Sequence, residues 1–159
     1  MNAAPDIRRM SAGELERLGL DSLREHILAQ AVVAHHRHAP LNPDKVAALL
    51  RDPVCVRYRA RILLELGDMA AHQFVHPGPR PGRPGNDDMV LFVHPALAHH
   101  PECLPAAVAY AIPQINYGDP VTDDHCLLYG AALLGITTEE YYAALCAIAD
   151  LVGAIPLHR

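Results

Sequence analysis

The chain has 159 residues, of which 51% are hydrophobic and 19% charged, and its formal net charge is −5 at pH 7. This length suits one domain with its own core, and the composition excludes a disordered chain. Lysines and arginines form no stripe and no long apolar run is present, so we expect neither a nucleic-acid partner nor a membrane span.

Helix-start signals mark the first part of the chain. Two Ser-x-x-Glu capping boxes begin at Ser11 and Ser22, and Gly19 lies between them. This pattern predicts a short helix that ends at Gly19 and a second helix over 23–36. Residues 1–10 precede the first signal and are expected to be flexible.

Proline-containing helix starts come next. Asn42 followed by Pro43 predicts a short helix that runs to about Arg51. Asp52 is also followed by a proline, and this predicts a long helix that runs to about Val75.

The centre of the chain changes character. The segment over 77–88 is rich in proline and glycine and has no apolar residue to anchor it beyond its prolines, so we expect a mobile loop. The run Met-Val-Leu-Phe-Val over 89–93 predicts one short strand or extended segment.

Three further helices follow this loop. The segment over 102–115 is almost entirely apolar, which predicts a helix in the middle of the structure or at a subunit interface. Thr122 and Gly135 are typical first and last residues of a helix. Thr137 opens a third capping box, and the helix after it is expected to end at Gly153.

These signals together predict the fold class. We expect a mainly α protein with one domain over 1–159, built as a bundle of six or seven helices around a Pro/Gly-rich loop. At most one short extended segment is expected, and residues 154–159 should form a C-terminal tail.

The predicted helix over 52–75 carries the candidate site. Its apolar residues form one stripe on a helical wheel, and four polar residues line one flank of that stripe: Glu65, Asp68, His72 and His76. His72 and His76 are four positions apart, so their rings can reach a common metal ion. Either carboxylate can serve as a further ligand or orient an imidazole.

A repeated tetrapeptide adds a third histidine. Phe-Val-His-Pro occurs at 74–77 and again at 92–95. If the loop between the copies closes, His94 comes to lie beside His76, with His99 as an alternative ligand. Three histidines with an open position predict zinc, whereas two histidines with a carboxylate fit iron, manganese or zinc.

Two functions therefore stay open. The first is a small metal-binding protein, which includes a metal-dependent enzyme acting on a small molecule at this site. The second is a non-catalytic helical interaction or accessory protein, and apolar helices in so short a chain predict a homodimer or another homo-oligomer. Neither a Gly-rich phosphate loop nor a Ser-His-Asp signature is present.

The remaining polar clusters are interpreted as structural. The histidines of 35–38 fit the end of a helix, where the dipole favours cations, and the segment over 116–119 fits a helix C-cap with Gly118. The four cysteines form no Cys-x-x-Cys pair and are interpreted as buried thiols. Together with an N-terminus that lacks the apolar run of a signal peptide, they predict a cytoplasmic protein.

Overall fold

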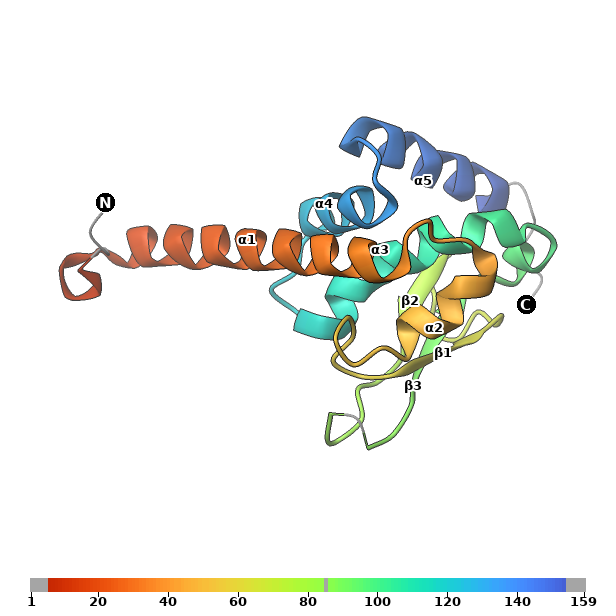
Figure 1. Cartoon of the computed structure of the whole chain (residues 1–159), viewed down its shortest axis with the longest axis horizontal. Coiled ribbons are helices and arrows are strands. Elements are labelled where there is room, and N and C mark those ends of the chain that lie inside the picture. The colour runs from red at the N-terminus through yellow and green to blue at the C-terminus, as the bar shows by residue number, and fades with distance from the viewer. Residues whose placement is uncertain (1–5, 85, 154–159) are drawn as a thin grey trace.

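Five α-helices and one three-stranded sheet form the part of the chain that this computed structural model describes, residues 6–84 and 86–153 (Figure 1). The helices are α1 (Ala12–His38), α2 (Val46–Leu50), α3 (Leu104–Tyr117), α4 (Asp123–Leu134) and α5 (Thr138–Gly153), and the strands are β1 (Ala60–Leu63), β2 (Val75–Pro77) and β3 (Met89–Val93). The predicted tail over 154–159 and the first half of the predicted flexible N-terminus lie outside the described residues. None of the described helices is long and apolar enough to cross a membrane.

The expectation of a mainly α protein is confirmed, but two details of it are wrong. There are five α-helices among the described residues rather than six or seven, and three strands rather than at most one. Both differences arise in the first half of the chain, because two predicted helices are joined into one and a third is replaced by strands.

The two predicted N-terminal helices are a single helix, α1. Its start is as predicted, since the Glu14 amide donates to Ser11 Oγ at 3.2 Å and the Ser11 amide donates to Glu14 Oε2 at 2.7 Å. Gly19 and Ser22 lie inside this helix, so Gly19 does not end a helix and Ser22 does not begin one. A glycine costs a helix only about 1 kcal/mol, and without a proline or another stop signal the backbone hydrogen bonds continue through it.

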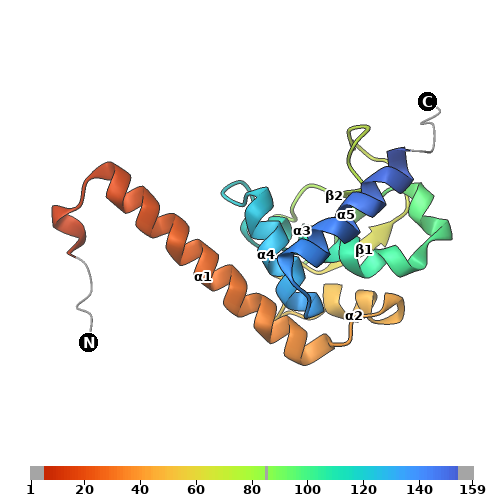
Figure 2. The same cartoon turned by 90° about the horizontal axis from the view of Figure 1, so that it is seen from above.

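The two halves of α1 differ in their surroundings (Figures 1 and 2). The C-terminal half packs on α4 and buries Ile27, Ala31 and Ala34. The N-terminal half projects from the body, and residues 11–22 are exposed apart from the half-buried Leu18.

The predicted long helix over 52–75 is wrong. The segment forms turns, strand β1 and the start of β2. Burial alternates along 57–61, because Tyr58 and Ala60 point inward while Arg57 and Arg61 are exposed, and this is the period of a strand rather than a helix. Gly67 then adopts a positive φ of 50°, which a helix cannot contain.

The sheet brings the two copies of the repeated tetrapeptide side by side. The strand order is β1-β3-β2, with β3 parallel to β1 and antiparallel to β2, so the predicted extended segment is the central strand. Val75 pairs with Val93 and His76 with Phe92, and the His94 amide donates to the Phe74 carbonyl at 2.8 Å. The repetition therefore forms an antiparallel strand pair.

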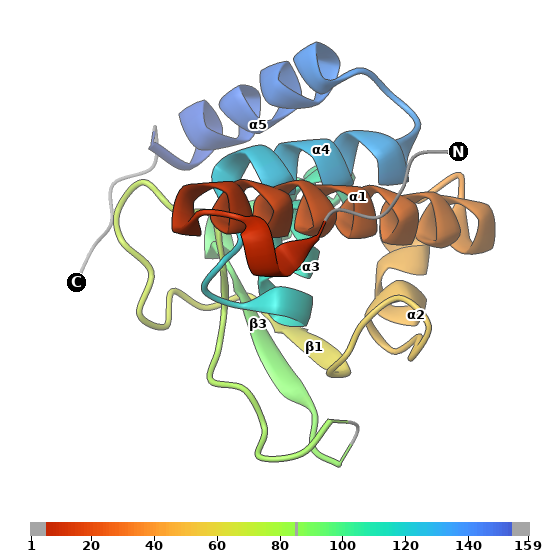
Figure 3. The ribbon, with the colours of Figure 1, turned by 90° about the vertical axis from the view of Figure 1, so that its left-hand side faces the viewer.

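The apolar helix α3 lies in the middle of the molecule, as predicted, beneath α4 and α5 and against the sheet (Figure 3). Val108, Ala109 and Ile112 are fully buried. The starts of the following helices are confirmed as well, because Thr122 caps α4 and Thr137 caps α5 through Glu140. Gly135 ends α4 in the left-handed conformation with a φ of 70°.

The loop over 77–88 is attached to the body through polar side chains. Arg80 Nη2 donates to the Gln114 carbonyl of α3 at 3.0 Å, and Asp88 forms an ion pair of 3.0 Å with Arg51. The mobility of this loop stays a prediction.

Candidate functional site

The five residues of the predicted metal site lie on separate segments. Glu65 and Asp68 lie in the turn after β1, His72 lies in the turn before β2, His76 belongs to β2, and His94 follows β3. The helix that was expected to align them does not form. Within residues 6–84 and 86–153, the three metal-ligating side chains whose ligand atoms lie close together belong to a different group. A metal ion at these five residues stays a prediction, but its geometric premise is wrong.

His94 has a structural position at the end of β3. Its side chain is only 2% exposed, and Nδ1 accepts a hydrogen bond of 3.1 Å from the Ala96 amide. Burial lowers the pKa of His94, because the charged imidazolium is poorly solvated there. Its Nε2 has no hydrogen-bond partner among the described residues. His94 is therefore a neutral core histidine that begins a 3₁₀ turn.

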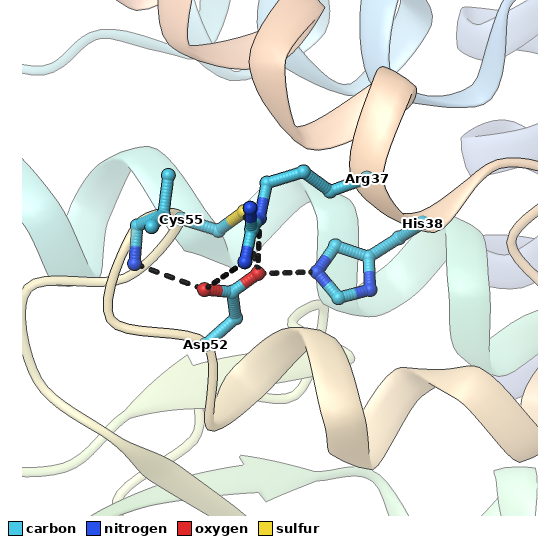
Figure 4. A network of polar contacts seen from close by, with 5 residues as sticks. Arg37, His38, Asp52 and Cys55 are labelled. Atoms are coloured by element: carbon cyan, nitrogen blue, oxygen red, sulfur yellow. Dashed lines mark hydrogen bonds and ion pairs between the residues drawn. The ribbon is translucent and has the colours of Figure 1, made fainter.

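The ligand atoms that do come together belong to His38, Asp52 and Cys55 (Figure 4). They all lie within 4.8 Å of one another. His38 is the last residue of α1, and the other two lie in the turn that follows α2. Asp52 Oδ2 is 2.7 Å from His38 Nε2 and 3.5 Å from Cys55 Sγ.

The local sequence explains the shape of this turn. Asp52 Oδ1 accepts the Val54 amide at 3.0 Å, and the Asp52 carbonyl accepts the amides of Cys55 at 3.0 Å and Val56 at 2.9 Å. An aspartate before a proline favours this kind of turn, because its side chain satisfies a backbone amide two residues later. Asp52 thus stabilises a single turn instead of starting the predicted long helix, and the turn points the side chains of Asp52 and Cys55 toward the end of α1.

Arg37 completes the surroundings of the carboxylate. Its Nε lies 2.7 Å from Asp52 Oδ2 and its Nη2 lies 3.3 Å from Oδ1. The Asp52 side chain is 7% exposed and that of Arg37 is 48% exposed. Burial alone would raise the pKa of Asp52, but the hydrogen bonds from Arg37 and His38 outweigh it and hold this pKa well below its usual range. The carboxylate is therefore ionised at neutral pH.

Cys55 is a thiol in this environment. Burial and the negative charge of Asp52 raise the pKa of Cys55 to about 11. A nucleophilic cysteine needs a lowered pKa, and here the sulfur lies 3.5 Å from the Asp52 carboxylate, whose negative charge opposes ionisation of the thiol. The arrangement therefore does not support cysteine nucleophile chemistry, whereas it offers nitrogen, oxygen and sulfur ligands on one side of the turn.

A cavity of about 310 Å³ opens beside this group, and Cys55 forms part of its wall. The far wall comes from the end of α3, where Asn116 Nδ2 donates to the Cys55 carbonyl at 2.9 Å. Tyr117 Oη and His26 Nδ1 are joined by a hydrogen bond of 2.6 Å on the same cavity wall. Asn116 and Tyr117, at the helix end that the sequence predicted, thus also line a cavity.

Sequence reasoning assigned His38 to a helix end, which is confirmed, and Asp52 to the start of a long helix, which is wrong because that helix does not form. It missed that the two residues meet. One local signal was present: Asp52 and Cys55 are three positions apart around a proline turn, a spacing that puts both side chains on one side. No signal in the sequence shows that the end of α1 lies against that turn.

No protein-family model matches this chain, and neither a curated protein nor a solved structure matches it significantly.

Proposed function

We propose that the protein binds a divalent transition metal, zinc above all, at His38, Asp52 and Cys55. The observation that carries this proposal is the mutual separation of the three ligand atoms, at most 4.8 Å. Imidazole nitrogen, carboxylate oxygen and thiolate sulfur are the ligand types of zinc sites, and the sulfur favours zinc over magnesium or calcium.

Small movements would bring these atoms to the spacing of a metal site. Ligand atoms on a tetrahedral zinc lie roughly 3.3 to 3.8 Å apart, given bond lengths of about 2.0 to 2.3 Å. Cys55 Sγ and Asp52 Oδ2 already have such a separation, 3.5 Å. His38 Nε2 and Asp52 Oδ2 are 2.7 Å apart, and this separation would have to increase by less than about 1 Å.

Arg37 is the competitor of the metal. Its guanidinium occupies both oxygens of Asp52, and a second positive charge beside it would be repelled. Because the side chain is half exposed, it can turn into solvent when a metal binds. Cys55 also forms part of the wall of the cavity of about 310 Å³, which would supply a water or a small ligand as the fourth partner. Three protein ligands with one open position are the arrangement of catalytic zinc.

Calorimetric titration of zinc into chelator-treated, tag-free protein tests this proposal. We expect about one equivalent of zinc to bind, with release of about one proton, because the Cys55 thiol has a raised pKa of about 11 and must ionise to bind the metal. Titrations in buffers of different ionisation enthalpy measure that proton.

Matched variants locate the site. Cys55→Ala should weaken zinc binding, and Cys146→Ala serves as the control because that cysteine is exposed and lies outside the group. Arg37→Gln should strengthen zinc binding, since it removes the competing charge. Absence of zinc binding, or binding equally weakened by both cysteine variants, would contradict the proposal.

The projecting half of α1 favours a second function, self-association. Leu15 is 38% exposed and Leu20 is 46% exposed there, on a helical segment that leaves the body of the molecule (Figure 2). An isolated helix of three turns is marginal in water, so this segment would gain stability from a partner helix.

We infer that the partner is a second copy of the same chain. Glu16, Leu20 and Arg24 are exposed and lie four positions apart, on one stripe of α1. In an antiparallel pair centred on Leu20, Glu16 of each copy faces Arg24 of the second copy, as two-fold symmetry requires. Leu20 and Arg24 also border a cavity of about 470 Å³ against α4, which would receive the second helix.

Charge reversal tests this pairing. Light scattering after size exclusion should give the mass of a dimer at high concentration. Glu16→Arg or Arg24→Glu alone should shift the protein toward monomer, and the two changes together should restore the dimer. Glu25→Arg, on the same helix but off the stripe, is the control. A parent protein that stays monomeric at about millimolar concentration would contradict the inference.

A further inference from the structure

A third cavity, of about 380 Å³, lies between the segment that leads into β2 and helices α3, α4 and α5. It has no residue in common with the Cys55 cavity or the proposed metal ligands. Its volume is in the range of sites for small organic ligands.

Aromatic rings form much of its lining. Phe74 comes from the segment before β2, Tyr110 from α3 and Tyr142 from α5. The rings of Phe74 and Tyr110 are tilted by 54° with centroids 6.1 Å apart, and Tyr142 is 59% exposed. The chain has 2 Phe and 6 Tyr, so three of its eight such rings meet at one cavity.

The described lining has one carboxylate and neither a lysine nor an arginine. Asp123, in the first turn of α4, supplies the only carboxylate among the residues described around this cavity. No described residue of the lining is Lys or Arg, and His72 is the one side chain there that can carry a positive charge. An anionic ligand therefore has little to bind.

The Tyr110 hydroxyl orients the carboxylate by donating a hydrogen bond to Asp123 Oδ1. Burial and this hydrogen bond raise the pKa of Tyr110, so the phenol stays neutral and remains a donor. Because Tyr110 occupies only Oδ1, the other oxygen of Asp123 is available to a ligand that carries hydrogen-bond donors or positive charge.

We propose that this cavity binds a small organic cation, with its ammonium group beside Asp123 and over the rings of Phe74, Tyr110 and Tyr142. Ring faces attract cations through their quadrupole, and the attraction increases when the cation leaves water. The ring faces suit a primary amine or a quaternary ammonium equally, and Asp123 adds charge attraction for both and a hydrogen bond for the amine. The site is independent of the proposed metal function.

Calorimetry with choline and its uncharged isostere 3,3-dimethylbutan-1-ol separates charge recognition from apolar burial. In the presence of a chelator, choline should bind with a stoichiometry of about one, and the alcohol should bind at least about 10-fold more weakly. n-Butylamine is titrated in parallel to distinguish the two kinds of ammonium group. Equal affinity for choline and the alcohol, or no binding of either ammonium compound, would overturn the proposal.

Adjacent aspartates provide a matched pair of variants. Asp123→Asn should weaken choline binding about 10-fold, whereas Asp124→Asn, in the same helical turn but outside the lining, should leave it unchanged. Tyr142→Ala should also weaken it, and because that side chain is exposed the thermal unfolding of the variant should match that of the parent. Equal affinities for the two aspartate variants would also overturn the proposal.

Discussion

Two glycines, Gly130 in α4 and Gly19 in α1, show how much the closeness of packing differs between the body of the molecule and the projecting half of α1. A methyl group at Gly130 of α4 would overlap the ring of Tyr141 of α5, whereas a methyl group at Gly19 of α1 would meet no other atom within 4 Å. Tyr141 is fully buried and its hydroxyl donates to the Ala106 carbonyl at 2.7 Å, so the ring cannot withdraw. The body is thus shaped by contacts between helices, while the projecting half of α1 depends on its own sequence.

The largest effect should come from Gly130→Ala. The added methyl group has to displace a buried, hydrogen-bonded ring, and we expect a loss of about 3 kcal/mol in the free energy of unfolding. Urea denaturation measures this loss. A variant as stable as the parent would show that α4 and α5 have room for a methyl group at this position and are not closely packed there.

The features that the sequence predicts correctly are those that depend on neighbouring residues or on overall hydrophobicity. The caps at Ser11, Thr122 and Thr137 are confirmed, because a cap depends on residues within three positions of each other. The central position of α3 is also confirmed, since a helix that is apolar all round has to be buried. Local signals and overall hydrophobicity therefore suffice for the second half of the chain.

The structure of the first half of the chain could not be predicted from local signals, because it depends on contacts between residues far apart in the sequence. The segment over 57–63 contains both an alternating pattern and part of an apolar stripe, and pairing of β1 with β3 decides between them. The expected alignment of His72 with His76 depended on a helix in that segment, and this helix does not form. His38 and Asp52 belong to two different segments of the chain. The sequence of neither segment indicates that the two residues are in contact.

Asp52→Asn should have the second largest effect, because it weakens the attachment of α1 to the turn after α2. Hydrogen bonds to a charged group contribute about 1.5 to 3 kcal/mol, so we expect a loss of about 2 kcal/mol at pH 7. Asp150→Asn, an exposed aspartate of α5, is the control and should change the stability by less than about 0.5 kcal/mol.

The same variant has a defined pH dependence. The pKa of Asp52 is lowered in the folded state, so its contribution is complete above the unfolded value of about 4 and is lost as the pH falls from there through the folded pKa. The difference between the parent and Asp52→Asn should therefore shrink in urea denaturation series taken below about pH 4. A difference that stays constant with pH would show that the hydrogen bonds to Asp52 do not depend on its charge.

The smallest effect, and one of opposite sign, should come from Gly19→Ala. Alanine favours a helix over glycine by about 0.8 to 1.0 kcal/mol, and nothing near Gly19 opposes the methyl group. Because the projecting half makes little contact with the body, this gain should remain local. Circular dichroism should show more helix, and amide hydrogen exchange over 12–22 should slow several-fold, while the urea midpoint stays within error of the parent. Gly19 lies about 100° around the helix from Leu20, so the proposed pairing stripe is left unchanged. If the urea midpoint rose by the full propensity difference, the projecting half would unfold together with the body, and the division between the two regions would not hold.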